Sequence, residues 1–208
     1  MQPLPLYDTF DAAREAVEEC TACERGAERQ LAVFGFGAPD AALMLVGEAP
    51  SSTDDATGKP FTGPAGRLLD DVLAEHGLHR RDLWITNLVR CFAGRMRDGR
   101  VENRPAKVGE IKACAQWLEL EIRMVDPKVL LAIGAPAAKA LIAKDFKLQE
   151  QRGQLSERAD GRLAIATLQP AYVMRLRNLV DRQAYLDARE LLSTDIALAA
   201  SAAGLSNG

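Results

Sequence analysis

Four short runs of almost purely apolar residues lie along the chain, each as long as a typical buried strand. They are residues 42–46, 83–88, 129–133 and 163–168. Because these runs are nearly continuous rather than alternating, they are typical of parallel strands covered on both faces. Apolar residues at helical spacing predict helices over residues 8–19, 65–76, 107–125, 136–144 and 181–200. This order of strands and helices predicts an α/β fold, a three-layer α/β/α sandwich around a central four-stranded, mostly parallel sheet.

Composition favours a single domain. The chain has 208 residues, of which 48% are hydrophobic, and this suffices for one sizeable core. We expect one domain over residues 1–200 and a disordered tail over residues 201–208. The N-terminus lacks a basic region followed by an apolar run, and no apolar stretch reaches membrane-spanning length. We therefore expect a soluble, cytoplasmic protein without membrane contact, and we take it to be a monomer.

Polar residues follow the first apolar run in a pattern that favours a binding site. The run ends in Gly47-Glu48-Ala49-Pro50, and a loop with Phe61 between two glycines then opens the next helix. The pattern places a carboxylate, Glu48, and an aromatic ring, Phe61, at the carboxyl edge of a buried strand, where open α/β sheets bind ligands. Taken alone, the segment 47–50 is compatible with an ordinary turn, and Phe61 is compatible with a core position. The joint spacing of the two segments argues against these alternatives.

Four cysteines form one close pair and two single positions: Cys20, Cys23, Cys91 and Cys114. Structural disulfides are disfavoured in the cytosol. A Cys-x-x-Cys pair is compatible with a redox dithiol, a zinc site or iron–sulfur ligation. A thioredoxin-like pair would follow a strand and open a helix, whereas this pair comes at the end of the first predicted helix. Zinc and iron–sulfur clusters both accept four thiolates, so the residues alone leave both open.

Taken together, these motifs resemble the iron–sulfur (family 4) uracil-DNA glycosylases of the uracil-DNA glycosylase superfamily. The resemblance covers roughly residues 15–180. It rests on residues 47–66, on Ile85-Thr86-Asn87-Leu88-Val89-Arg90-Cys91, on Gln169-Pro170-Ala171 with Arg175, and on the order of the four cysteines. It implies that Cys20, Cys23, Cys91 and Cys114 hold one [4Fe-4S] cluster. Hydrolysis of a glycosidic bond needs no redox step, so we expect the cluster to be structural.

The resemblance also implies roles for the motif residues in recognising a base. Phe61 would stack on a uracil extruded from DNA. The amide of Asn87 offers a donor and an acceptor together, which complement uracil O4 and N3–H, whereas cytosine presents the reverse pair. Gly47 and Ala49 would contribute backbone contacts to the substrate.

Glu48 and Gln169 are the expected catalytic residues. Glu48 would position the attacking water or stabilise the cationic sugar, and Gln169 would face uracil O2. Gln169 is the main departure from the family, which has histidine there to stabilise negative charge on that oxygen. A glutamine amide can donate to O2 but is neutral, and weakening such a donor costs about 2.7–4 kcal/mol of transition-state stabilisation. Two smaller departures are Ser51, where the family has glycine, and a longer segment over residues 94–101.

Basic residues gather in two segments, although the net charge is −3. The net charge argues only weakly against nucleic-acid binding, because binding depends on where the charges lie. A solvated surface is the alternative for each segment alone, but both follow polar motifs and therefore favour a DNA-facing rim. The expected DNA contacts are Arg90, Arg95, Arg97, Arg100, Tyr172 and Arg175.

The sequence thus predicts a base-excision repair enzyme that flips uracil out of DNA and hydrolyses its N-glycosidic bond. A uracil- or damaged-base-binding protein with weak or no turnover is the alternative, and Gln169 motivates it. A superfamily variant that bonds covalently to the sugar uses a histidine after the second motif, and residues 91–114 contain none. A nucleotide-binding protein would need a glycine-rich phosphate loop, and neither common form occurs.

Overall fold

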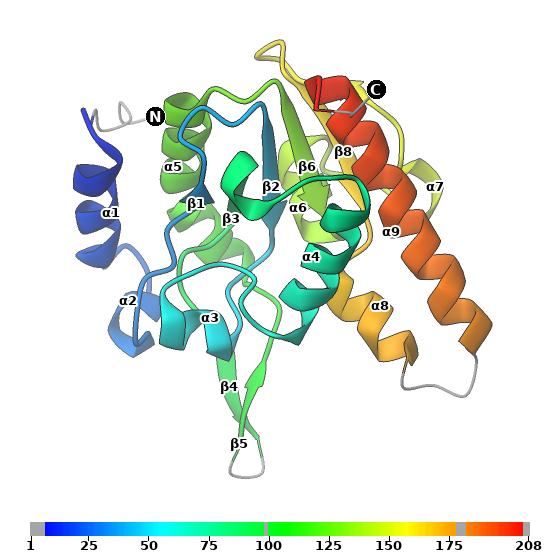
Figure 1. Cartoon of the computed structure of the whole chain (residues 1–208). Coiled ribbons are helices and arrows are strands. Elements are labelled where there is room, and N and C mark those ends of the chain that lie inside the picture. The colour runs from blue at the N-terminus through cyan, green and yellow to red at the C-terminus, as the bar shows by residue number, and fades with distance from the viewer. Residues whose placement is uncertain (1–6, 98–99, 178–181, 206–208) are drawn as a thin grey trace.

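A six-stranded sheet forms the centre of the molecule (Figure 1). The computed structural model of the chain describes residues 7–97, 100–177 and 182–205, and for residues 95–97, 100 and 101 the backbone alone. The sheet has the order β1-β3-β2-β6-β8-β7. Its four inner strands are parallel and are β3 (Trp84–Asn87), β2 (Leu43–Gly47), β6 (Val129–Ile133) and β8 (Leu163–Thr167). The α/β class and the mostly parallel sheet are confirmed.

The expected number of four strands was wrong. Two edge strands, β1 (Phe36–Gly37) and β7 (Ser156–Glu157), pair antiparallel with β3 and β8. Each has only two residues and is partly exposed, so neither leaves an apolar run in the sequence. The four apolar runs correspond to the inner strands only.

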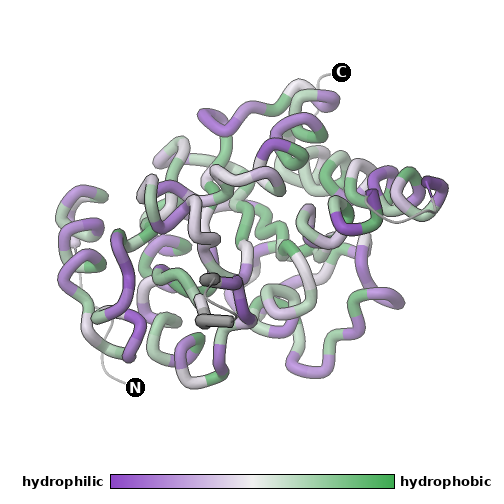
Figure 2. Tube along the Cα trace, turned by 90° about the horizontal axis from the view of Figure 1, so that it is seen from below, coloured by the Kyte–Doolittle hydropathy of each residue, from purple (hydrophilic) through white to green (hydrophobic). Residues whose placement is uncertain are grey.

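Helices cover both faces of the sheet. On one face, α1 (Phe10–Glu18), α5 (Val108–Val125) and α6 (Ala135–Leu141) pack over a cluster that includes Met44 and Leu130. On the other face, α4 (Pro64–Glu75), α8 (Pro170–Arg177) and α9 (Arg182–Ala203) pack over Leu45 and Leu131. Neighbouring strand residues thus point into opposite cores, which is why the runs are continuously apolar. Figure 2 shows the hydrophilic stretches mainly at the periphery.

Short elements connect these layers. They are α2 (Arg25–Glu28), α3 (Ser52–Thr57), the 3-10 turn η1 (Arg80–Asp82) and α7 (Leu148–Gln151). The segment expected as a surface loop after the second motif is a hairpin of β4 (Gly94–Arg97) and β5 (Arg100–Asn103), which projects from the body in Figure 1. Ser51 caps α3 in a reciprocal capping box with Asp54, and this gives the departure at Ser51 a local structural role.

The last helix is longer than expected. Helix α9 continues to Ala203, whose side chain is buried, so residues 201–203 are not a disordered tail. Small alanines at this end pack into the core on this face of the sheet, where the sequence was expected to fray. Residues 206–208 of the expected tail lie outside the described residues. No helix in the described part of the chain has the length and apolar character of a membrane span.

Candidate active site

A cleft of about 680 Å³ opens at the carboxyl ends of the parallel strands. Glu48 follows β2, Asn87 ends β3 and Gln169 follows β8, while Phe61 comes from the loop before α4; all four line the cleft. From β2 the chain passes to β3 on one side and then crosses to β6 on the other side of β2, so the strand order reverses between β2 and β6. Ligands of open α/β sheets bind at such a switch point.

The amide of Asn87 is buried at the wall of the cleft. Its side chain is 2% exposed, and within the described part of the chain its Nδ2 has no hydrogen-bond partner. A Cβ atom on Gly47 would lie 2.4 Å from Asn87 Oδ1 and 2.6 Å from Phe61 Cζ, so only glycine fits between the amide and the ring. An unpaired buried donor costs about 1–3 kcal/mol, which indicates a position for a ligand acceptor.

Phe61 is held in an unusual backbone conformation. Its φ is 55°, in the left-handed region that non-glycine residues rarely adopt. The next residue, Thr62, is fixed by Asp54, whose Oδ1 accepts from Thr62 N at 2.6 Å and from Thr62 Oγ1 at 2.7 Å. Such strain is of the order of 1–3 kcal/mol and persists only where the surroundings enforce it, often at functional sites.

Glu48 receives hydrogen bonds from two separate loops. The backbone N–H of Ala106 donates to Glu48 Oε1 at 2.8 Å, and Gln169 Nε2 donates to Glu48 Oε2 at 3.4 Å. Gln169 lies against Gly134, where a Cβ atom would be 2.4 Å from Gln169 Cγ. The carboxylate and the glutamine amide therefore form one polar unit at the cleft, and each limits the orientation of the other.

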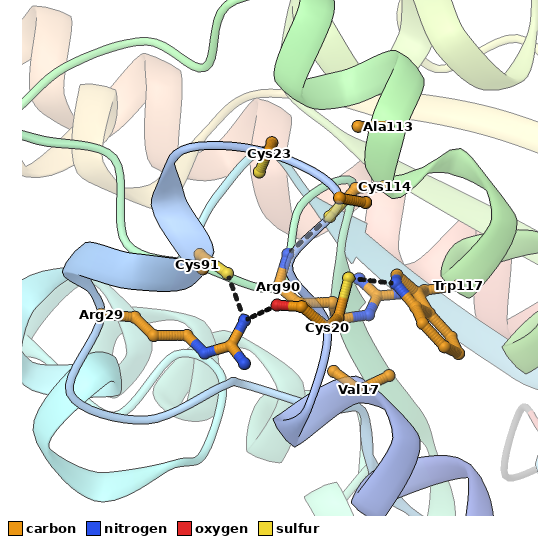
Figure 3. A pocket seen from close by; sticks show the side chains of 11 residues that line it. Val17, Cys20, Cys23, Arg29, Arg90, Cys91, Ala113, Cys114 and Trp117 are labelled. Carbon is orange, nitrogen blue, oxygen red and sulfur yellow. Dashed lines mark hydrogen bonds between the residues drawn. The ribbon is translucent and has the colours of Figure 1, made fainter.

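The four cysteines line one small pocket (Figure 3). Arg29 Nη1 donates to Cys91 Sγ at 3.2 Å, and Trp117 Nε1 donates to Cys20 Sγ at 3.3 Å. The backbone N–H of Arg90 lies 3.5 Å from Cys114 Sγ. Hydrogen-bond donors and a nearby cation stabilise thiolates, so the pocket suits a thiolate-ligated metal centre.

Burial favours the neutral thiol form of Cys91 and Cys114 over the thiolate. Burial raises the pKa of Cys91 and raises that of Cys114 to about 11. Binding of a metal would therefore release protons from this pocket. Four sulfurs around one pocket fit the donor set of an iron–sulfur cluster. Among the described residues, no three His, Cys, Asp or Glu side chains lie close enough to hold a single ion.

Comparison with known proteins assigns the family. The Uracil DNA glycosylase superfamily profile matches residues 34–191, most of the chain. The chain belongs to the uracil-DNA glycosylase superfamily. It is 33% identical over 172 residues to a Type-4 uracil-DNA glycosylase of Thermotoga maritima, with 82% of this chain and 86% of the relative covered. Proteins of the same name from Pyrobaculum aerophilum (34% over 168 residues, 77% and 82% covered) and Sulfurisphaera tokodaii (36% over 138 residues, 66% and 60% covered) also match.

One expected DNA contact in this member of the uracil-DNA glycosylase superfamily was wrong. Arg90 is 1% exposed, and its Nη2 lies 3.0 Å from Oε1 of the buried Glu121. Its Nη1 donates to the backbone carbonyl of Asn87. Glu121 also accepts from Trp84 Nε1 at 2.8 Å. From the sequence alone, a basic residue in a loop is expected to be exposed. The acidic partner of Arg90 lies on α5, too far along the chain to be recognised from the sequence. Arg90 thus braces the backbone of Asn87 instead of facing DNA.

Among the described residues, two basic side chains of this superfamily member line the cleft, Arg175 and Arg104. Arg175 lines it and is exposed, and Tyr172 is 37% exposed on the same helix, α8. Arg104 also lines the cleft but is bound by Glu110, and the two side chains form a bidentate pair. The Arg104 guanidinium lowers the pKa of Glu110 to about 2. The side chains of three expected contacts in the hairpin lie outside the described residues: Arg95, Arg97 and Arg100.

Proposed function

We propose that this protein excises uracil from DNA by hydrolysing the bond between the base and deoxyribose. The buried Asn87 amide carries the proposal: its Nδ2 has no partner within the described part of the chain, and Asn87 lines the cleft together with Phe61. A flat heterocycle with an acceptor next to a donor satisfies both, and uracil offers O4 next to N3–H. Membership of the superfamily and the names of the relatives support the same substrate.

Recognition would take place on a base flipped out of the stack into the cleft. The Phe61 ring would stack on the face of the uracil, while Asn87 Nδ2 donates to O4 and Asn87 Oδ1 accepts from N3–H. Gly47 would allow this arrangement because it has no side chain to separate the ring from the amide. Ala49, which also lines the cleft, would contact the base through its backbone.

Glu48 and Gln169 would act at the glycosidic bond. Ala106 and Gln169 orient the Glu48 carboxylate, which would position the attacking water or stabilise the positive charge on the sugar. A glutamine Nε2 carries two hydrogens, so Gln169 can donate one to Glu48 and the other to uracil O2. The amide would thus stabilise the negative charge that the departing base develops on O2, although less strongly than a cationic or more polarising group.

The partner in this proposal is uracil-containing DNA. Arg175 and Tyr172 would contact the strand beside the cleft, together with Arg95, Arg97 and Arg100 of the hairpin. Such contacts to phosphates would hold the strand while the cleft selects the base. We propose that the protein acts as a monomer in the cytoplasm.

We further propose that Cys20, Cys23, Cys91 and Cys114 hold a [4Fe-4S] cluster. The shared pocket supports this ligand set, as does the resemblance of the cysteine order to that of family 4. When bound, the cluster supplies a structural cross-link between the N-terminal segment, the end of the second motif and α5. The cysteines would in this way fix the segment next to Asn87.

Protein purified without air is expected to be brown and to contain about four irons per chain. Replacement of a buried ligand, Cys114→Ser, should lower the iron content and bleach the visible absorbance. Metal analysis and absorbance spectra of both proteins check this expectation. One zinc per chain, without iron, in the parent protein would contradict the assignment.

A strand-excision assay tests the proposed function itself. The purified protein is incubated with a labelled oligonucleotide that contains one uracil, and alkali then cleaves any abasic site. Cleavage of the uracil strand is expected, with none of a matched strand that carries thymine at the same position. Binding to the uracil strand is measured in the same buffer. Selective binding without cleavage would instead favour the damaged-base-binding alternative.

A further inference from the structure

We propose that Arg80 is a positioning residue that holds the Phe61 ring in place for stacking on the extruded base. The inference rests on the proposed function, because it assigns a role to a residue that acts only through Phe61. Arg80 lies in η1, between α4 and β3, and is not among the residues that line the cleft. Its side chain is 23% exposed, so most of it is packed against the protein.

The guanidinium of Arg80 binds the backbone of the loop that carries the ring. Arg80 Nη1 donates to the carbonyl of Pro60 at 2.9 Å, and Arg80 Nη2 donates to the carbonyl of Phe61. Arg80 Nε donates to Asp70 Oδ1 on α4 at 2.5 Å. The planar fork of an arginine can bind two consecutive carbonyls and a carboxylate at once, which a lysine ammonium cannot reproduce with the same geometry.

The conformation held by these bonds is one that Phe61 would not adopt without support. At φ 55° the residue lies in the left-handed region, which is unfavourable for a side chain with a Cβ atom. The Phe61 carbonyl also faces Gly66 closely, since a Cβ atom there would lie 1.7 Å from the carbonyl oxygen. This backbone geometry directs the ring to Gly47 and Asn87. Without the bonds from Arg80, we expect the loop to relax and the ring to leave that position.

Arg80 differs in one respect from the other group that fixes the loop. Asp54 binds Thr62, one residue beyond the ring, and also caps α3, so its loss would disturb a helix as well. Arg80 binds the carbonyl of Phe61 itself. A change at Arg80 therefore probes the orientation of the ring more directly than a change at Asp54.

A double-mutant cycle between Arg80→Met and Phe61→Ala tests the inference. Methionine keeps much of the apolar stem of arginine but donates no hydrogen bonds. We expect Arg80→Met to lower kcat/KM on uracil-containing DNA by about 10–100-fold, since small misplacements of a binding group can cost that much. In the Phe61→Ala background the same change should cost less than about twofold, because the ring it positions is gone. Thermal midpoints of all four proteins are measured in parallel.

Two further variants complete the design. Arg81→Met is the matched control, because Arg81 is the next residue and its side chain is 80% exposed; we expect unchanged kinetics. Arg80→Lys keeps the charge and some donors, so it should recover part of the lost kcat/KM. If Arg80→Met does not fold, Arg80→Lys is taken through the same cycle with Phe61→Ala.

The outcomes separate this inference from the proposed function. Equal losses from Arg80→Met with and without the Phe61 ring would overturn the inference, because Arg80 would then act elsewhere. An active Arg80→Met beside an inactive Phe61→Ala would also overturn it, while leaving the stacking role of Phe61 intact. A fully active Phe61→Ala would remove both the stacking role and the inference. A loss of activity in Arg80→Met that is absent in the Phe61→Ala background would support both the stacking role of Phe61 and the inference about Arg80.

Discussion

Asn87→Ala is expected to abolish most of the preference of the protein for uracil over cytosine. Asn87 is 2% exposed and lines the cleft together with Phe61, and among the described residues its Nδ2 has no hydrogen-bond partner. Alanine removes both hydrogen-bonding groups, so the O4 and N3–H of a bound uracil would be buried without partners. Each such loss costs on the order of 1–3 kcal/mol, equivalent to about 5–150-fold in binding.

Competition binding with strands that carry uracil, cytosine or thymine at one position measures this preference. Asn103→Ala serves as the matched control, because Asn103 lines the same cleft but is exposed. The control should keep the uracil preference. If Asn87→Ala kept it too, the amide would not be the reader of the base, and the assignment of the second motif would have to be withdrawn.

Gln169→His is expected to raise the rate constant of uracil excision in single-turnover experiments. An imidazole stabilises negative charge on uracil O2 better than a neutral amide, and one such contact sets a ceiling of about 10²–10³-fold. Gly134 has no side chain where the Gln169 side chain lies against it, so no Cβ atom at that position opposes the histidine ring. The change in substrate binding should be smaller than the change in rate, since the charge develops only as the bond breaks.

Gln154→His is a suitable control, because Gln154 is an exposed glutamine on a different loop. It should leave the single-turnover rate unchanged. An unchanged or lower rate in Gln169→His would mean that the pocket is built around the glutamine, whose Nε2 also holds Glu48. The expectation of weak catalysis would then be abandoned, and Gln169 would count as a catalytic residue with its own geometry.

The inner part of the fold could be predicted from the sequence because burial leaves a clear pattern. The strand Val129–Ile133 was predicted to the residue, since it is apolar throughout and lies between two cores. Strands β1 and β7 could not be found in the same way, because two residues carry no periodicity. Helix α8 was missed although Pro170 is its first residue, a position where proline is common.

Those cleft residues that lie at the ends of strands could be predicted from the sequence. The residues that support the cleft by binding backbone carbonyls could not. Glu48 and Asn87 follow apolar runs, so their placement at one edge of the sheet follows from the parallel order. Arg90 and Arg80 carry no such signal. Their partners are the acid Glu121 far along the chain and the carbonyl of Phe61, and a sequence does not show which carbonyls a fold leaves exposed to a guanidinium. Charged residues near motifs were therefore assigned to the surface.

The direction of α9 has a practical consequence for handling the molecule. Its 22 residues span about 33 Å, and the helix runs from the side of α8 to the far end of the sheet, away from the cleft (Figure 1). The C-terminal end of α9 therefore lies toward the end of the sheet opposite to the carboxyl ends of its parallel strands (Figure 1). A dye, a surface tether or a second protein joined at that end would leave the approach of a DNA strand unobstructed. The same end is thus the natural place to anchor the molecule in single-molecule experiments.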